Sequence, residues 1–174
     1  MMRAFIAAIA AGMILSAPLE AAGSLQRFDA MIGNWQGGGW MQRGPERSAF
    51  TGHETVRYAL DGTALLIEGW HFTEREGRQV PAHTALALIR AVPRSEGEYS
   101  IHSWLSDGRD IEGWARWAGE EFHWGFSLPE RRREIRYRIR IDGDRWTEVG
   151  ETRAGTGEWV KFFEMRMLRL EGND

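Results

Sequence analysis

The 174-residue chain has no cysteine, only five prolines, and a single lysine, Lys161, among its 22 basic residues. The absence of cysteine excludes a disulfide framework, a thiolate metal site and a cysteine nucleophile. The formal net charge is only −3, which gives no general attraction to nucleic acid, so we expect no nucleic-acid partner. After the N-terminal leader, no stretch approaches the roughly 18 apolar residues of a spanning helix, so no integral membrane segment is expected.

Glycine and tryptophan, in contrast, are abundant, with 21 and 9 residues respectively. The chain is 43% hydrophobic and 27% charged, a composition that excludes a disordered protein. Its length predicts one domain of ordinary size with a core of its own. Composition alone would suit a site for a carbohydrate or an aromatic ligand, so the positions of the indoles become the question.

Residues 1–23 have the pattern of a secretory signal peptide. Arg3 supplies a positive charge, an apolar run of about 12 residues follows, and small residues lead up to Gly23. Cleavage is expected after Gly23 or after Ala21, and a retained anchor is the alternative interpretation. We therefore predict a periplasmic or secreted protein whose mature domain spans residues 24–174.

The mature chain is expected to begin with one short helix over residues 24–32, capped by Ser24 and ended by Gly33. After it come short runs of β-branched and aromatic residues separated by turn signals. The clearest turns are Asp-Gly pairs, at Asp61-Gly62, Asp107-Gly108 and Asp142-Gly143. The predicted strands span residues 34–43, 49–60, 63–74, 82–91, 98–106, 109–118, 120–128, 132–142, 144–153 and 157–170.

A period of two is sharpest in residues 135–141, where four apolar side chains alternate with three arginines. Only a strand with one solvated face explains this pattern. About ten consecutive strands with short links form an antiparallel meander, and closing it removes the exposed edges. We therefore predict an all-β fold, a roughly ten-stranded antiparallel up-and-down barrel with a short N-terminal helix. Glycines inside the strands permit the close approaches that a small barrel needs.

The order of these elements resembles a known group of proteins. A short helix leading into Ile32-Gly33-Asn34-Trp35 and then a ten-strand meander resembles the calycin-type barrels, which include lipocalins, fatty-acid-binding proteins and nitrobindin-like haem proteins. More closely, the chain is similar to the DUF1579 family of uncharacterised bacterial proteins, through that segment, the Leu60-Asp61-Gly62 turn and the closing segment 159–165 with Arg166 or Arg169. The resemblance covers essentially the whole mature chain. It implies a barrel and brings no established activity.

The resemblance also implies a structural role for the tryptophan of the first strand. In calycins this residue packs across the closed end of the barrel against an arginine of a late strand. By position Trp35 would take that role, with Arg166 or Arg169 as its partner. A guanidinium on an indole face is a cation–π contact worth about 0.5–2 kcal/mol.

A barrel of about ten strands is wider than its own side chains fill, so it can hold a small ligand. One hypothesis is a cavity lined by indoles, in which a few polar groups place the ligand. Its residues are Trp70, Trp104, Trp114 and Trp124 with Glu68, His102 and Glu112. The alternative is a filled, tryptophan-rich core with the glutamates and the histidine outside. Strand parity does not decide which face is inside, because the opposite sets are also largely apolar: Leu65, Ile67, Gly69 and His71; Ile101, Ser103 and Leu105; Ile111, Gly113, Ala115 and Trp117.

The histidines give only a weak metal signal. No two of them have the i, i+2 spacing of one strand, so only a cross-strand trio could bind a metal. In nitrobindin-like proteins a histidine near the C-terminal strands binds the haem iron, whereas no histidine follows His123 in this chain. We therefore expect no metal site and no cofactor. The five residues are His53, His71, His83, His102 and His123.

Six glutamates lie inside predicted strands: Glu54, Glu68, Glu112, Glu148, Glu151 and Glu164. Two carboxyl groups facing into a barrel could have separated pKa values and perform acid–base chemistry. Glutamates paired with arginine are far commoner, and the chain has no Gly-x-Ser-x-Gly motif, so no catalytic residue is assigned. The arginine-rich run from Arg131 to Arg140 could contact an anionic partner, but its spacing favours the solvated face of one strand.

The function that these patterns favour is the binding of a small apolar or aromatic molecule inside an exported barrel, without covalent chemistry. One alternative is a filled barrel that acts through its outer surface, and another is an enzyme with acid–base Glu and His residues inside. A binding barrel predicts a cavity of roughly several hundred Å³, and a filled barrel predicts none. An enzyme requires two titratable groups within hydrogen-bond reach in a cleft.

Overall fold

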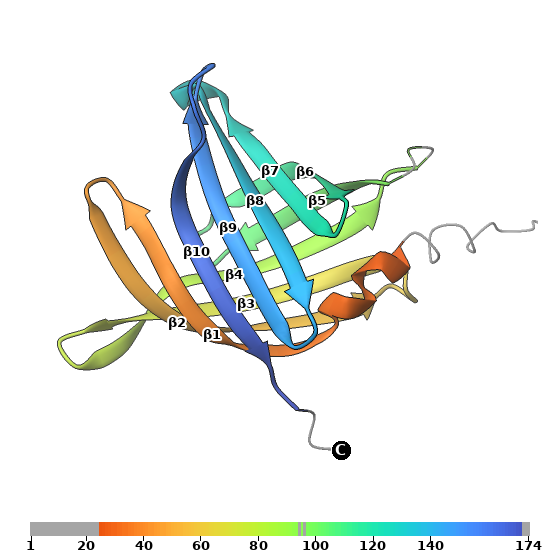
Figure 1. The fold of residues 1–174 in the computed structure, drawn as a ribbon, viewed down its shortest axis with the longest axis horizontal. Helices are drawn as coiled ribbons and strands as arrows, with labels where there is room; N and C mark the ends of the chain where they lie inside the picture. The colour runs from red at the N-terminus through yellow and green to blue at the C-terminus, as the bar shows by residue number, and fades with distance from the viewer. Residues whose placement is uncertain (1–24, 94, 96, 172–174) are drawn as a thin grey trace, which may run out of the picture.

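The computed structural model describes residues 25–93, 95 and 97–171, and its ten strands close into one antiparallel barrel (Figure 1). Each strand pairs with its neighbours in sequence, and the first strand pairs with the last. This confirms the predicted up-and-down barrel, whereas the predicted signal peptide and the predicted cap Ser24 lie outside the described residues. The strands are β1 (Gly33–Arg43), β2 (Glu46–Ala59), β3 (Ala64–Arg75), β4 (Arg78–Ala91), β5 (Glu98–Leu105), β6 (Asp110–Ala118), β7 (Glu121–Leu128), β8 (Arg133–Asp142), β9 (Arg145–Ala154) and β10 (Val160–Arg169).

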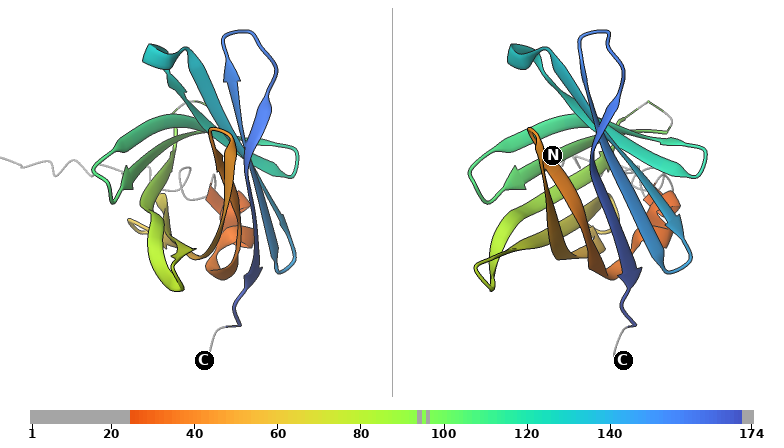
Figure 2. Two further views of the ribbon diagram at one scale, coloured as in Figure 1. Left: turned by 90° about the vertical axis from the view of Figure 1, so that its left-hand side faces the viewer. Right: turned by 60° about the vertical axis from the view of Figure 1, so that its left-hand side comes forward.

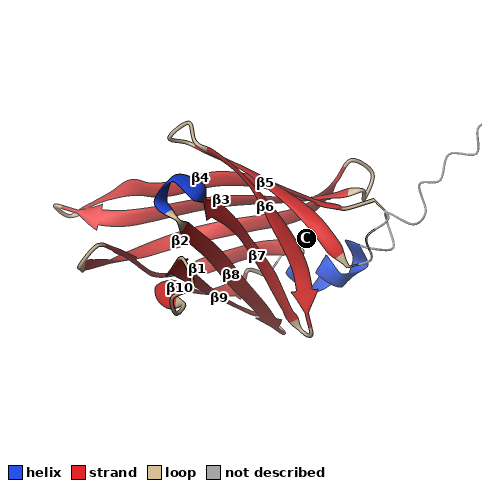
Figure 3. Cartoon of the chain, turned by 90° about the horizontal axis from the view of Figure 1, so that it is seen from above, coloured by secondary structure: helices blue, strands red, loops and turns tan. Residues whose placement is uncertain are grey.

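The N-terminal helix, η1 (Gln26–Met31), is shorter and tighter than predicted, because it is a 3-10 helix. Its apolar residues Leu25, Phe28 and Met31 recur every three positions, which matches the three residues per turn of a 3-10 helix. A second 3-10 turn, η2 (Pro129–Arg131), joins β7 to β8. The two short helices lie at opposite ends of the barrel (Figure 3).

Two strands begin at least three residues earlier than predicted, β2 at Glu46 and β4 at Arg78. The segment 75–81, expected as a loop, is mostly strand and turns only at Glu76 and Gly77, whose φ angles are +51° and +72°. Two consecutive residues with positive φ form the hairpin turn whose twist matches that of the flanking strands. The β3–β4 hairpin therefore projects from the barrel, on the same side as the β1–β2 hairpin (Figure 1).

Closure of the barrel depends on glycines in β1. A Cβ on Gly37 or Gly39 would collide with backbone carbonyl oxygens of β10, those of Arg166 and Glu164 respectively. Glycine therefore permits the close approach of the first and last strands, and the pairing from Trp35↔Arg169 onward follows from it.

Helix η1 lies across one end of the barrel and closes it (Figure 2). Phe28 inserts there and meets the rings of Tyr99, Trp117 and Phe122 at centroid distances of 5.1, 5.3 and 4.9 Å. The helix is held from outside by Arg27, whose Nη2 donates to the carbonyl oxygen of Gly119 at 2.9 Å. Side chains therefore fill the interior of the barrel at this end.

Trp35 is fully buried at this closed end, with its Nε1 donating to the carbonyl oxygen of Met31 at 2.9 Å. The guanidinium carbon of Arg169 lies 4.1 Å from the centroid of its ring, and Arg169 also donates to carbonyl oxygens of Ala30 and Ile32. Arg166 is exposed and pairs with Glu164 instead. Of the two predicted partners, Arg169 is therefore the one that packs against Trp35.

The arginine stripe of β8 lies on the outer face, as its spacing indicated. Nε of Arg136 and of Arg138 lie 2.8 and 3.3 Å from the same Glu151 carboxylate oxygen of β9. Such pairs of half-exposed ions stabilise a sheet only slightly. The apolar residues between them, such as Ile139, point into the barrel.

Candidate ligand cavity

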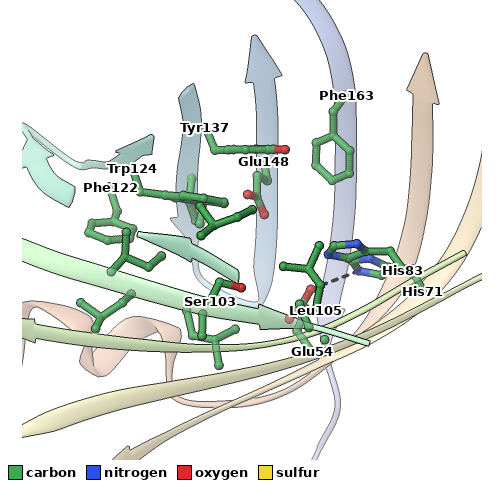
Figure 4. Close-up of a pocket in the computed structure, with 18 of the residues that line it drawn as sticks. Glu54, His71, His83, Ser103, Leu105, Phe122, Trp124, Tyr137, Glu148 and Phe163 are labelled. Atoms are coloured by element: carbon green, nitrogen blue, oxygen red, sulfur yellow. Dashed lines mark ion pairs between the residues drawn. The ribbon is translucent and has the colours of Figure 1, made fainter. Parts of the chain in front are cut away.

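The barrel interior is not completely filled, and a cavity of about 140 Å³ remains (Figure 4). It is smaller than the several hundred Å³ expected of a binding barrel, because aromatic rings occupy much of the interior. Trp124 stacks on Tyr137 at 4.2 Å with an interplanar angle of 10°, and Phe163 meets Tyr137 edge-on at 5.7 Å. The cavity therefore has an aromatic wall on the β7, β8 and β10 side.

Six polar side chains interrupt the apolar lining: Glu54 on β2, His71 on β3, His83 on β4, Ser103 on β5, Tyr137 on β8 and Glu148 on β9. Glu54 shares the inward parity of Phe50 and Val56, and Glu148 shares that of Trp146. In Figure 4 the Glu54 carboxyl lies beside the two imidazoles, and Glu148 lies near Tyr137 on the aromatic side of the same cavity. The polar groups of the barrel interior therefore lie along this one cavity.

Glycines on neighbouring strands make room for three of these side chains. A Cβ on Gly69 would lie 2.7 Å from Oε1 of Glu54, its partner in the β2–β3 register. A Cβ on Gly150 would lie 2.8 Å from Cε1 of Tyr137. A Cβ on Gly52 would collide with the His71 ring. The missing side chains thus provide the volume that the polar groups occupy.

Glu54 and His71 form the central pair. Nε2 of His71 lies 3.1 Å from Oε1 of Glu54, and each side chain is only 9% exposed. Burial raises the pKa of Glu54 to about 8 and lowers that of His71 to about 4, because a charged form loses its hydration inside the barrel. At neutral pH the pair is therefore a carboxylic acid beside a neutral imidazole. The contact is close, but Nε2 has no well-aligned hydrogen-bond partner.

His83 stacks against His71 at a centroid distance of 5.7 Å and an interplanar angle of 16°. Burial lowers its pKa to about 4, and the nearby His71 and Arg109 act in the same direction. Both imidazoles are therefore neutral at pH 7.

Glu148 is the second buried acid of the cavity. Burial raises its pKa to about 8, with a further contribution from Glu54, while the indole N–H groups of Trp124 and Trp146 favour its ionised form. Nε1 of Trp146 is nevertheless buried without a well-aligned hydrogen bond. Burial and the neighbouring Glu148 also raise the pKa of the Tyr137 hydroxyl.

The cavity continues toward the hairpin end of the barrel. A wider hollow of about 490 Å³ opens between the ends of β1, β2, β3 and β4, and it shares Met41, His71 and His83 with the inner cavity. Charged side chains of both signs surround this mouth, among them Arg43 and Glu74. A small molecule entering from this side would meet the two histidines first.

Only Trp124 of the four predicted indoles lines the cavity. Trp70, Trp104 and Trp114 lie on the outer face and are 37%, 43% and 41% exposed. The predicted wall is corrected in position, because on β3, β5 and β6 the opposite parity set faces inward. For these three residues, a role in ligand binding stays a prediction.

The three predicted polar residues also lie outside the cavity. Nε2 of His102 lies 3.3 Å from Asp110, and its Nδ1 lies 3.7 Å from the exposed Glu112. Glu68 faces Arg57 at 3.8 Å. Glu68 also borders a shallow outer groove between Trp70 and Trp104. Six of the seven predicted residues thus lie outside the cavity, on β3, β5 and β6.

Within residues 25–171, omitting the two undescribed positions of the β4–β5 loop, no group of three or more acidic or histidine side chains is arranged to hold a metal ion. The part of the chain described by the structure also has no helix long and apolar enough to cross a membrane.

A closed antiparallel barrel, with a helix and a buried Trp–Arg pair at one end and a cavity opening at the other, defines a calycin-like barrel. The chain resembles the crystal structure of Rv2717c from M. tuberculosis with a TM-score of 0.67 and 15% identity, over 89% of this chain and 99% of that one. It also resembles the S-type phycobiliprotein lyase CPES from Guillardia theta, with a TM-score of 0.59 and 9% identity, over 84% and 92% of the two chains. At such low identity the likeness concerns the fold alone.

No family model matches the chain, and no curated protein matches it. The resemblance to the DUF1579 family therefore stays a prediction.

Proposed function

We propose that this protein is an exported barrel that binds a small apolar or aromatic molecule, non-covalently, in its interior cavity. The observation that carries the proposal is the interior cavity of about 140 Å³, in whose wall Nε2 of His71 and Nε1 of Trp146 have no well-aligned hydrogen bond beyond their contacts with Glu54 and Glu148. Buried polar atoms are almost always hydrogen-bonded, since an unmade bond costs about 1–3 kcal/mol. A ligand with a polar group would satisfy them.

The size and the polarity of the cavity define the ligand further. An apolar cavity of about 150 Å³ holds benzene, so the 140 Å³ here suits a molecule with one ring. The likeness in fold between this chain and a phycobiliprotein lyase is compatible with a ligand-binding role.

A second candidate function is interaction with a partner through the outer surface. It is favoured by Trp70 on β3, Trp104 on β5 and Trp114 on β6, which expose large aromatic surfaces on the outer face of the barrel. Single exposed apolar residues are ordinary, whereas a contiguous patch marks a contact site. In this candidate the cavity would remain unused.

Binding is tested first by native mass spectrometry of the protein purified from its own host, where a co-purifying small molecule is expected. A panel of one-ring aromatic compounds is then titrated against the intrinsic tryptophan fluorescence, to which Trp124 in the cavity wall contributes. A clean apo mass together with no response to any compound would refute interior binding.

A cavity-filling variant sharpens this test. Ala87 lines the cavity, so Ala87→Leu should abolish the fluorescence response while the far-UV circular dichroism is unchanged. Ala118→Leu makes the same change at an exposed position at the end of β6 and should bind like the wild type. Equal binding by both variants would indicate that the ligand binds on the outer surface.

Export is tested separately, from the mass of the mature chain in the extracytoplasmic fraction. A chain beginning at Ser24, or at Ala22 for the alternative cut, is expected. An intact chain that starts at Met1 in the cytoplasmic fraction would contradict export without affecting the binding proposal.

A further inference from the structure

The ionisable groups of the cavity are unbalanced in charge. Its described lining contains the two carboxyl groups of Glu54 and Glu148 but no arginine or lysine. Arg109 influences His83 and Tyr137 from the β5–β6 turn, where its Nη2 is paired with Asp107 at 2.6 Å. The interior can therefore acquire negative charge and has no cation of its own to balance it.

The aromatic wall of the cavity also favours a positively charged ligand. The parallel stack of Trp124 and Tyr137 and the edge-on ring of Phe163 present π-systems on the side of the cavity where Glu148 lies, whereas Glu54 lies beside His71 (Figure 4). An aromatic face carries partial negative charge and attracts a cation, most strongly where water is excluded. Acids and aromatic rings thus point to a ligand of the same charge sign, a positive one.

Glu148 has the surroundings of a counter-ion. The indole N–H groups of Trp124 and Trp146 favour its carboxylate form, against the effects of burial and of Glu54. Nε1 of Trp146 and Nε2 of His71 are buried without well-aligned partners in the same cavity. Nε2 of His71 lies 3.1 Å from Oε1 of Glu54, and the indole N–H of Trp146 acts on Glu148, so both nitrogen atoms belong to the polar cluster around the two carboxyl groups. A neutral imidazole nitrogen can accept a hydrogen bond from a cationic ligand, and the indole N–H can donate to the Glu148 carboxylate that faces it.

We propose that the ligand is a small aromatic amine, bound as its ammonium ion, with the Glu148 carboxylate as counter-ion and the Trp124–Tyr137 stack against its ring. This inference rests on the proposed function of interior ligand binding. A cavity of about 140 Å³ fits one ring, and the adjoining hollow of about 490 Å³ provides the further space that a short amino-alkyl arm needs.

The proton balance of the complex follows directly. An ammonium ion that binds to protonated Glu148 releases one proton to water, and an amine that enters as the free base takes the Glu148 proton instead. The other titratable groups that face this part of the cavity are Glu54, His71, His83 and Tyr137. Both histidines have pKa values lowered to about 4, and the pKa of the Tyr137 hydroxyl is raised, so all three groups are neutral at pH 7. Glu148 and Glu54 are therefore the sources of the proton.

Three probes with the same phenyl ring and two-carbon arm test the charge preference: 2-phenylethylamine, 2-phenylethanol and the somewhat larger 3-phenylpropionate. Isothermal titration calorimetry at pH 7 should show the amine binding at least tenfold more tightly than the alcohol, with no detectable binding of the carboxylate. Titrations in two buffers of different ionisation enthalpy should show close to one proton released per amine bound. Equal or tighter binding of the alcohol would overturn the inference.

A matched pair of variants separates Glu148 from a general effect of lost charge. Glu148→Gln should weaken amine binding at least tenfold, abolish most of the proton release and leave alcohol binding within about twofold. Glu151→Gln removes a carboxylate from the outer face of the same strand, where it pairs with Arg136, and should change neither. Equal weakening of amine and alcohol by Glu148→Gln would refute the counter-ion role.

The same measurements distinguish this inference from the proposed function. If the neutral aromatic panel binds and 2-phenylethylamine does not, only the amine inference fails. If neither the panel nor the amine binds, both fail together.

Discussion

The two buried acids make the stability of the protein depend on pH in a defined window. Glu54 and Glu148 have pKa values of about 8 in the folded chain, raised from 4.5 mainly by burial. Between these values the folded state holds protons that the unfolded state has lost. The free energy of unfolding therefore falls as the pH rises, until the folded-state pKa is passed.

The buried histidines have the opposite effect at lower pH. His71 and His83 have pKa values of about 4, lowered by burial from 6.5, so unfolding takes up protons between these values and stability rises with pH. The two effects oppose each other between about pH 4.5 and 6.5, and only the acids act from 6.5 to 8. Each acid contributes a slope of about 1.4 kcal/mol per pH unit. Together they should lower the free energy of unfolding by about 4 kcal/mol over this window.

Urea unfolding at intervals from pH 6 to 8.5 measures this slope, and Glu148→Gln should reduce it by about half because one acid remains. Glu151→Gln, with its carboxylate on the outer face of β9, should leave the slope unchanged. A wild-type stability that is constant or rises between pH 6.5 and 8 would show that the two carboxyl groups are ionised in the folded protein, and the description of the cavity as uncharged would be wrong.

Three further outcomes are expected. Arg169→Leu should lower the free energy of unfolding by about 1–3 kcal/mol in thermal or urea unfolding, because the indole contact and the carbonyl hydrogen bonds are lost, whereas Arg166→Leu at its exposed site should change it by less than about 0.5 kcal/mol. Gly69→Ala should weaken ligand binding measured by calorimetry, because its methyl group would lie 2.7 Å from the Glu54 carboxyl; unchanged affinity would mean that Glu54 can move freely. Trp104→Ala, at a 43% exposed position, should leave interior binding unchanged, and a loss of binding there would support a site on the outer surface.

The fold could be predicted from the sequence because the relevant signals are local. Asp-Gly turns fix where strands end, and β8 alternates so regularly that one face must be wet. The barrel then follows from the number of strands and the shortness of the links. The link over residues 75–81 was predicted too long, because only Gly77 is a usual turn residue there and Glu76 adopts a positive φ that its type rarely shows.

The cavity wall could not be predicted from parity, because β3 and β5 are apolar on both faces. Trp70 and Trp104 lie outside while Ile67 and Ile101 lie inside. A tryptophan on the outer face of a sheet gains partial burial against neighbouring strands, so the larger side chain is not always the inner one. Burial preference alone therefore selects the wrong face on these strands.

A signal for the inner polar residues was nevertheless present. Glu54 has the same strand parity as the apolar residues Phe50 and Val56, so the face that they bury also buries Glu54. The interior glycines carry the complementary information, but only once the register is known: Gly69 is opposite Glu54, and that pairing requires the three-dimensional alignment of β2 with β3. The sequence shows the polar residues and the glycines that accommodate them, but it does not show which glycine lies opposite which polar residue.

The energetics of the interior argue for a function there. Glu54 and Glu148 lower the stability of the fold at neutral pH, in a chain that has no disulfide to compensate, and apolar residues of similar size would avoid that penalty. The outer-surface candidate offers no reason for two carboxyl groups inside the barrel, because an interaction through Trp104 would not involve them. A ligand that pairs with Glu148 returns the lost free energy by giving the carboxylate a partner in a site without water. Interior binding therefore accounts for the cavity, the nitrogen atoms without well-aligned hydrogen bonds and the buried acids together.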